Sequence, residues 1–164
     1  MARHNEQPKT IYLKDYKKPP FEVEHLELLF EIFDGYTVVT STALYARGDN
    51  EDESLHLDGE NLELISIEIE GEEVKAFQKD LHGLTLDMTG HDRALVKIKT
   101  KIKPETNTAL EGLYMSDGIY CTQCEAEGFR HITYFQDRPD VMTEFTVRVE
   151  ADKTKCPVLL SNGN

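Results

Sequence analysis

The sequence predicts an all-β fold, an antiparallel sandwich or barrel, and three observations support this. Short segments of alternating apolar and polar residues follow one another along most of the 164 residues. Turn-forming residues separate these segments, and no stretch of a dozen residues repeats its apolar side chains at helical spacing. A chain of short strands joined by turns packs most simply as an antiparallel sandwich or a barrel.

The first third of the chain contains the longest strand pattern. Residues 11–13 are predicted to form a short first strand, and a strict alternation begins at Phe21. One face of this alternation carries Leu26, Leu28, Phe30 and Ile32. Asp34-Gly35 predicts a tight hairpin, because glycine adopts the positive φ that such turns require. The return strand, residues 36–45, is rich in Val and Thr, which favour strands.

Four further segments in the middle of the chain are predicted to be strands: residues 55–57, 62–69, 84–88 and 94–103. Glu70-Gly71-Glu72 ends the segment at residues 62–69 and is expected to turn the chain back. The last one places Lys97, Lys99, Lys101 and Lys103 on one face. An anion site is one interpretation of this row of lysines. A solvated face of an edge strand, where lysines oppose aggregation, is favoured in so acidic a chain.

Strands resume in the C-terminal part after a second turn signal, Asp117-Gly118. A strand through Cys121 follows that turn, and residues 145–150 and 157–160 are predicted to be the last two strands. A short helix near residues 139–144 interrupts this pattern. Asp137 is its expected cap, with a proline and an acidic residue in the first turn.

Composition limits the function classes. The formal net charge is −13, so binding to a nucleic-acid backbone is not expected. No apolar run approaches the roughly 18 residues of a membrane span, and the N-terminus lacks the apolar core of a signal peptide. Three cysteines agree with a reducing compartment. The chain is therefore expected to be cytoplasmic, with residues 1–9 as a flexible leader and residues 10–164 as one β domain.

Common catalytic and metal motifs give little support. Cys121-x-x-Cys124 is half of a zinc site, but only Cys156 and His131 remain as further ligands, at unsupported spacing. Two half-buried thiols are the better interpretation. The acidic run at residues 49–53 lacks the spacing of a calcium-binding loop. No G-x-S-x-G elbow and no glycine-rich phosphate loop occur in the sequence.

Gln123 and Glu125 are the candidate binding residues. In an extended strand they share one face, where an amide and a carboxylate together accept the hydrogen bonds of one ammonium group. Polar residues on the open face of a strand are also ordinary, so the pattern alone favours no ligand.

The chain resembles the N-terminal domain of bacterial aminopeptidase N. Members of this family are zinc-dependent metallopeptidases. The matching segments are NTALEGLY from Asn107, CTQCEAEGFRHITYF from Cys121, DRPDV from Asp137 and KCPVLLSNGN from Lys155. Leu13-Lys14-Asp15-Tyr16 and Thr37-Val38-Val39-Thr40 extend the match to nearly the whole chain. Asp137-Arg138-Pro139 fits the bacterial alanyl type rather than the mammalian type, which carries Asp-Glu-Pro there.

This resemblance implies a saddle-like β-sandwich packed on a catalytic domain, with peptides as substrates. It implies that Glu125 helps to anchor the free α-amine of the substrate and that Gln123 lines the same pocket. The zinc motif H-E-x-x-H and the G-A-M-E-N segment of the family are absent. The chain is therefore expected to be one piece of a longer enzyme, to bind no zinc itself and to hydrolyse no peptide alone.

Two other interpretations remain open at this point: a free-standing β-sandwich binding module, and a metal-binding domain built on the three cysteines. A domain separated from its neighbour is also expected to expose an apolar patch. The candidates for this patch are Tyr114, Met115, Phe129, Tyr134 and Phe135.

Overall fold

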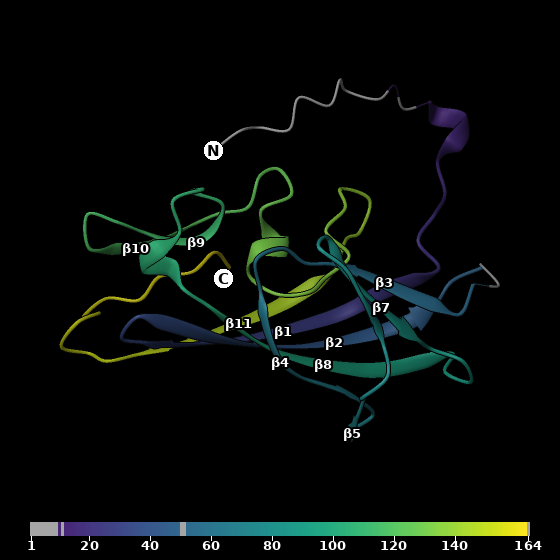
Figure 1. The fold of residues 1–164 in the computed structure, drawn as a ribbon, viewed down its shortest axis with the longest axis horizontal. Coiled ribbons are helices and arrows are strands. Elements are labelled where there is room, and N and C mark those ends of the chain that lie inside the picture. The colour runs from purple at the N-terminus through teal and green to yellow at the C-terminus, as the bar shows by residue number, and fades with distance from the viewer. Residues whose placement is uncertain (1–9, 11, 50–51, 164) are drawn as a thin grey trace.

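The computed structural model describes residues 10, 12–49 and 52–163, and the leader predicted at residues 1–9 lies outside them. Six strands form the main sheet in the order β11-β1-β2-β8-β4-β5 (Figure 1). Their bounds are β1 (Phe21–Phe33), β2 (Tyr36–Arg47), β4 (Glu63–Ile69), β5 (Glu72–Glu73), β8 (Arg93–Ile102) and β11 (Glu144–Ala151). The all-β prediction is confirmed.

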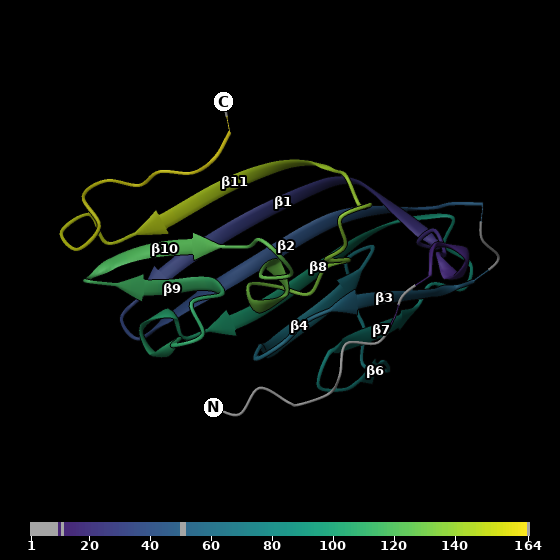
Figure 2. The same ribbon diagram turned by 90° about the horizontal axis from the view of Figure 1, so that it is seen from above.

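Two smaller sheets lie over one face of the main sheet (Figure 1). One has the order β3-β7-β6, with β3 (Ser54–Asp58), β6 (Gln78–Lys79) and β7 (Gly83–Asp87). The other pairs β9 (Gly112–Ser116) with β10 (Ile119–Gln123) and lies near β1 and β11 in the view from above (Figure 2). Three single-turn 3₁₀ helices complete the described chain: η1 (Leu13–Asp15), η2 (Pro104–Thr106) and η3 (Phe129–His131).

The hairpins form at the predicted turns. Gly35, with φ of +80°, joins β1 to β2, and Gly71, with φ of +82°, joins β4 to β5. Asp117 and Gly118 both have positive φ and join β9 to β10. The Glu70-Gly71 and Asp117-Gly118 turns have positive φ at both central residues, so they match the right-handed twist of the strands that they connect.

The core lies between the main sheet and the layer above it. Alternate residues of β1, β2 and β8 point inward and meet Leu55, Leu57, Leu84 and Leu86, which are at most 1% exposed. This layer arrangement, in which each sheet buries one apolar face, is that of a sandwich.

Two strand predictions need correction. β11 pairs with β1 in parallel, so the main sheet is mixed and not purely antiparallel. β8 lies between β2 and β4, so the lysine row belongs to a central strand, not an edge strand. On its outer face Lys97, Lys99 and Lys101 form ion pairs with Glu68, Glu31 and Glu63.

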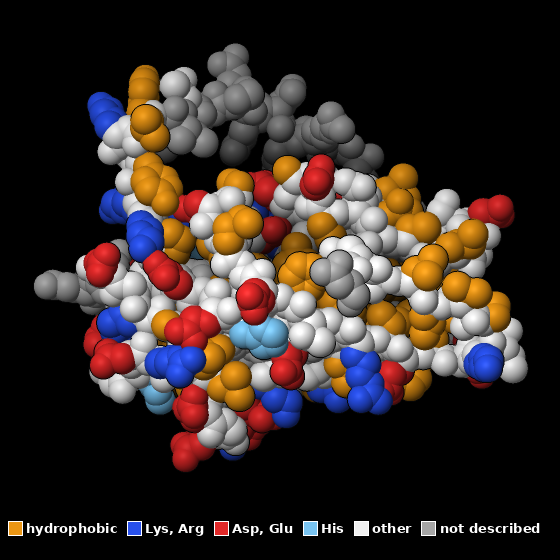
Figure 3. Space-filling model, turned by 180° about the vertical axis from the view of Figure 1, so that it is seen from behind, with side chains coloured by type: hydrophobic (Ala, Val, Ile, Leu, Met, Phe, Trp, Pro, Cys, Tyr) orange, Lys and Arg blue, Asp and Glu red, His pale blue; other side chains and the backbone are white. Residues whose placement is uncertain are grey.

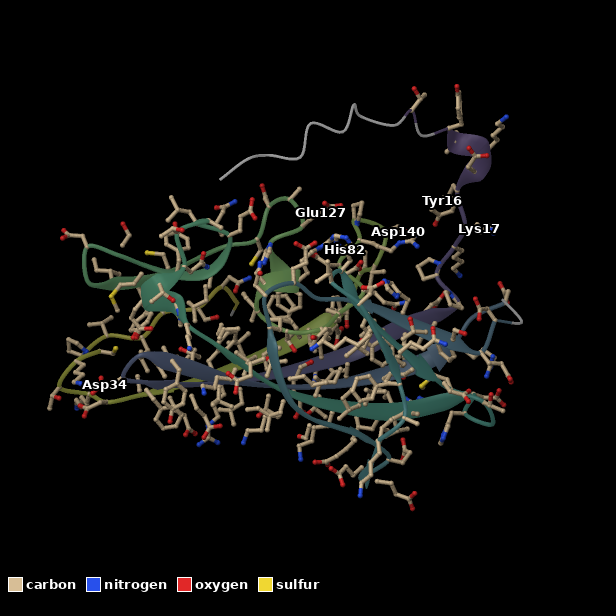
Figure 4. The ribbon with its side chains drawn as sticks, viewed as in Figure 1. Tyr16, Lys17, Asp34, His82, Glu127 and Asp140 are labelled. Atoms are coloured by element: carbon tan, nitrogen blue, oxygen red, sulfur yellow. The ribbon has the colours of Figure 1, made fainter. Side chains whose placement is uncertain are left out.

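The predicted helix at residues 139–144 is wrong: this segment is a turn that leads into β11. The expected cap, Asp137, has its carboxylate occupied by Arg130, and Asp140 is held by Arg138 and by the hydroxyl of Tyr16. Figure 4 shows Tyr16 and Asp140 close to one another. The contacts of Asp137 with Arg130, and of Asp140 with Arg138 and Tyr16, replace the first turn of a helix.

Two short strand predictions are also wrong. Leu13 opens the 3₁₀ helix η1, and residue 11 lies outside the described residues. Residues 157–160 form no strand, although they were predicted to be the last one. Val158 and Leu160 are 71% and 89% exposed, so nothing among the described residues covers them.

Candidate functional site

The candidate residues Gln123 and Glu125 lie where β10 ends. Gln123 is the last residue of the strand, opposite Gly112 of β9. Glu125 lies beyond the strand, in a turn over residues 125–128. The prediction that both side chains share one strand face is therefore wrong, because the strand stops two residues before Glu125.

The turn nevertheless brings the two residues together. The side-chain amide Nε2 of Gln123 donates a hydrogen bond of 2.9 Å to the main-chain carbonyl of Glu125. The Gly128 N–H donates one of 2.9 Å to the carbonyl of Cys124, and the Glu125–Ala126 peptide bond is cis. A Cβ at Gly128 would lie 2.5 Å from the Gln123 carbonyl oxygen, so only glycine fits at this close approach.

The carboxylate of Glu125 is exposed and has no hydrogen bond or ion pair within the part of the chain that the structure describes. The neighbouring acids differ: Glu127 lies 3.6 Å from Arg130, and Asp137 lies 3.1 Å from it. Arg130 is therefore engaged elsewhere, and the acid at position 125 is not locked against an arginine.

Arg130 fixes the segment that follows the turn. Its main-chain N–H and its Nε both donate to Oδ2 of Asp137, each at 3.1 Å, and its Nη2 donates to the Asp137 carbonyl. Asp58 of β3 accepts from the Asp137 N–H at 3.0 Å. Burial opposes the charge of Arg130, but the hydrogen bond with Asp137 and the nearby carboxylates raise its pKa. The turn that carries Glu125 is thus tied to the β3-β7-β6 sheet.

β10 is fixed at its other end by Tyr120. Its hydroxyl donates to Oε1 of Glu105, which also accepts from the main-chain N–H of Gly35 at 3.2 Å. Desolvation and this hydrogen bond raise the pKa of Tyr120, so its hydroxyl stays protonated. Gln123 is therefore presented from a strand that is anchored to the β1–β2 turn.

A deep trough runs beside β10. Its volume is about 1230 Å³, and its walls are the inner faces of β1 and β11, the whole of β10 and residues 155–162. Gln123 and Glu125 lie in its lining. Figure 3 shows hydrophobic side chains gathered at this end of the molecule.

The expected apolar patch is only partly correct. Tyr134 and Phe135 are 2% and 7% exposed, so they belong to the core, where Tyr134 packs against Gly59. Tyr114, Met115 and Phe129 are half-buried. The apolar side chains that are most exposed around the trough were not singled out from the sequence: Ile119, Phe145, Val158 and Leu160. The sequence placed these residues in predicted strands, but it did not show that their side chains would be exposed.

The described residues of this chain do not fit a zinc ion. All three cysteines are free and half-buried. No group of three or more His, Cys, Asp or Glu side chains within the described ranges is arranged as metal ligands. In residues 10, 12–49 and 52–163 we find no helix of the length and apolarity that a membrane crossing requires.

Comparison with known proteins gives a consistent result. Residues 21–164 match the family model described as the Peptidase M1 N-terminal domain. The chain is 45% identical over 159 residues to aminopeptidase N of Escherichia coli (strain K12) and 47% identical over 158 residues to that of Haemophilus influenzae. These matches cover 97% and 95% of this chain but 18% of each relative, so the chain spans less than a fifth of their length.

Solved structures agree with these matches. The crystal structure of Legionella pneumophila aminopeptidase A in complex with aspartic acid superposes with a TM-score of 0.84 at 26% identity, over 92% of this chain and 18% of that one. The M1 zinc metallopeptidase of Deinococcus radiodurans shares the fold, with a TM-score of 0.67 at 16% identity over 80% of this chain and 32% of that one. The chain therefore belongs to the Peptidase M1 N-terminal domain family.

Proposed function

We propose that this chain is the N-terminal part of a zinc-dependent aminopeptidase that removes N-terminal amino acids from peptides, and that Gln123 and Glu125 line the pocket for the substrate α-amine. The relatives at 45–47% identity are named aminopeptidase N, which supports the enzyme class. On this proposal the zinc is held by polypeptide outside this chain, since the described residues offer no set of zinc ligands.

The observation that carries the amine-anchoring role is the unpaired carboxylate of Glu125. Arg130 neutralises both neighbouring acids, Glu127 and Asp137, and leaves Glu125 without a counter-charge among the residues described. An ammonium group has three donors and satisfies such a carboxylate. A peptide with a blocked N-terminus brings no charge, so the carboxylate would be desolvated without a partner. This difference gives selectivity for free N-termini.

The same proposal assigns two properties to the chain alone. It folds but does not hydrolyse peptides, because the water-activating metal lies elsewhere, and it packs against the catalytic domain of the same polypeptide in the cytoplasm. Zinc added to the isolated chain with an alanyl chromogenic substrate is expected to give no turnover.

The test of the anchoring role is Glu125→Gln in the longer enzyme. We expect KM for a free-amine alanyl substrate to rise and kcat/KM to fall by roughly 10- to 100-fold, because a charge-assisted hydrogen bond is lost. Fold and stability should be unchanged, since the Glu125 side chain makes no contact that stabilises the turn.

Glu127→Gln is the matched control. It removes the same charge two residues away, from a side chain that is 68% exposed, and its ion pair with Arg130 is long at 3.6 Å. We expect kcat/KM to change by less than about threefold. Equal losses for the two variants would refute a specific role for Glu125.

A further inference from the structure

The segment NTALEG, residues 107–112, has no role in the proposed function, yet the structure holds it firmly. The side chain of Asn107 donates hydrogen bonds of 2.8 Å and 2.9 Å to the carbonyls of Glu111 and Leu113. Leu110 has a φ of +60°, which a residue with a side chain rarely adopts. Such a backbone persists where the surrounding structure fixes it. The main chain on both sides of Glu111 therefore has a defined conformation.

The side chain of Glu111 ends beside His131, the last residue of η3. Nε2 of His131 lies 3.3 Å from Oε2 of Glu111, and the imidazole is 13% exposed, whereas the carboxylate is 57% exposed. Among the described residues, Glu111 is the only hydrogen-bonding or ion-pair partner of this ring. A largely buried polar ring without a partner is costly, so the pair fixes the orientation of the imidazole.

His131 also contacts the backbone around the candidate site. A Cβ at Gly112 would lie 2.8 Å from Cβ of His131 and 3.2 Å from the carbonyl oxygen of Gly128. Gly112 is the partner in register of Gln123. Gly128 ends the turn that begins at Glu125, and its carbonyl accepts a hydrogen bond of 3.2 Å from the His131 N–H. His131 therefore lies where the β9–β10 hairpin meets that turn.

The two candidate residues have different supports. Gln123 ends β10 and belongs to the β9–β10 hairpin, whereas the segment after Glu125 is tied to the β3-β7-β6 sheet through the Arg130 network. The pair of Glu111 with His131 joins these supports, because one residue leads into β9 and the other ends η3. In the described ranges, no other ion pair joins the hairpin to the turn or to η3.

We infer that His131, oriented by Glu111, is a positioning residue for the proposed amine pocket. The pair sets the spacing between the Gln123 amide and the Glu125 carboxylate by holding the hairpin and the turn together. It acts through the backbone, so its loss weakens binding of a free N-terminus and leaves the chemistry at the metal unchanged. This inference deepens the proposed function and rests on it.

His131→Ala in the longer enzyme tests this role through a split between KM and kcat. We expect KM for a free-amine alanyl substrate to rise about 5- to 20-fold and kcat to stay within about twofold, because only substrate binding is weakened. His131→Gln keeps an N–H donor at a similar reach, so its KM should stay within about threefold of the unaltered value. An unchanged KM in His131→Ala, or an equal rise in both variants, would overturn the inference.

His25→Ala is the matched control. His25 also pairs with a glutamate, Glu27, at 3.9 Å, and its side chain is 39% exposed. It lies on the face of β1 opposite to the buried Leu26, away from the hairpin. We expect its KM to change by less than about twofold. A rise as large as that of His131→Ala would show general damage and not positioning.

A double-mutant cycle measures whether the two side chains act as one unit. The variants are Glu111→Gln, His131→Ala and their combination in the longer enzyme. Because either change breaks the same contact, we expect KM of the combined variant to lie within about twofold of that of His131→Ala alone. A combined effect equal to the product of the two single effects would mean that the residues act independently, against the inference.

Hydrogen–deuterium exchange of the longer enzyme without substrate reads the geometry directly. We expect amides of residues 123–128 to exchange about 3- to 10-fold faster in Glu111→Gln and in His131→Ala than in the unaltered enzyme. β8 is paired on both sides and should exchange equally in all three proteins. Unchanged exchange of residues 123–128 in both variants would refute the positioning role.

The two proposals fail separately. An unchanged KM in Glu125→Gln would refute amine anchoring, whereas the exchange of residues 123–128 is measured with no substrate present. Faster exchange in His131→Ala without a rise in KM, in an enzyme whose KM does respond to Glu125→Gln, would make the contact purely structural and overturn its role in the pocket.

Discussion

The side-chain amide of Gln123 reaches across the end of β10 and donates to the main-chain carbonyl of Glu125 at 2.9 Å. The side chain of Gln123 therefore positions the backbone of Glu125, the second residue of the proposed amine pocket. The amide group has an acceptor oxygen left over, for which no partner occurs among the described residues, so Gln123 retains capacity for a ligand.

Gln123→Ala is expected to loosen the turn at residues 124–128. Loss of one exposed hydrogen bond costs about 1 kcal/mol locally, which corresponds to roughly fivefold faster amide exchange in the turn. In the longer enzyme KM for a free-amine substrate should rise as well. Thr122→Ala, one residue earlier on the same strand and also exposed, is the control and should change neither value. A rigid turn in Gln123→Ala would contradict the positioning role.

Gly128→Ala tests the close approach beneath that turn. The added Cβ would lie 2.5 Å from the Gln123 carbonyl oxygen and 2.8 Å from Cα of Cys124, both backbone atoms. We expect thermal unfolding to show a loss of about 1–3 kcal/mol. Gly48→Ala is the matched control, because its nearest neighbour lies at 3.5 Å, and it should stay within about 0.5 kcal/mol. Equal stability of the two variants would show that the turn shifts freely.

Arg130→Ala is expected to destabilise the domain by about 2–3 kcal/mol, because it leaves the carboxylate of Asp137 buried and without its cation. Both side chains are 15% exposed. Arg148→Ala removes an arginine whose pair with Glu150 is at the surface, with 75% of the arginine side chain exposed, and should cost at most about 1 kcal/mol. Chemical denaturation of both variants measures the difference, and similar losses would mean that the Arg130 network is not structural.

The contact between the N-terminal segment and residue 140 predicts a pH effect. The hydrogen bond from Arg138 lowers the pKa of Asp140 below its ordinary value, and a second hydrogen bond from Tyr16 adds to this. A carboxyl with a lowered pKa in the folded state stabilises the fold above the ordinary carboxyl range, and that contribution disappears as the pH falls below about 4.

Arg138→Ala should therefore raise the pKa of Asp140 in an NMR titration and reduce the loss of stability on acidification. Asp80 is the control carboxylate. Its pKa is lowered by backbone hydrogen bonds from His82 and Gly83, so it should titrate identically in the variant. A shift of both carboxylates would indicate a general change in the fold.

Much of the fold follows from local sequence patterns. Alternation from Phe21 and glycine at positions 35, 71 and 118 specify strands and turns, because these choices depend on neighbouring residues alone. The parallel pairing of β11 with β1 was not predicted, since it joins segments from the two ends of the chain. Pattern also failed at residues 139–144, where Arg130 holds the expected cap, Asp137, and Tyr16 holds Asp140, the acidic residue expected in the first turn.

At the candidate site, too, the sequence predicted the residues but not the contacts that position them. An amide and a carboxylate two residues apart were the candidate binding pair, and the structure joins them by a hydrogen bond from the Gln123 side chain to the Glu125 main chain. Their geometry was predicted wrongly, because the end of β10 is set by the approach of Gly128 to the backbone, a contact that alternation does not encode. The trough and its exposed rim were not visible in the sequence, since apolar residues of a covered and an uncovered strand look alike.

The parallel pair β1 and β11 has a consequence for biosynthesis. On a ribosome, the first long strand emerges early, but its outer neighbour is translated only near the end of these 164 residues. Until then one edge of β1 stays open, and pairing must close a loop that spans most of the chain. A nascent chain of this family therefore completes its main sheet late, and the apolar face around Leu28 remains accessible to chaperones while translation continues.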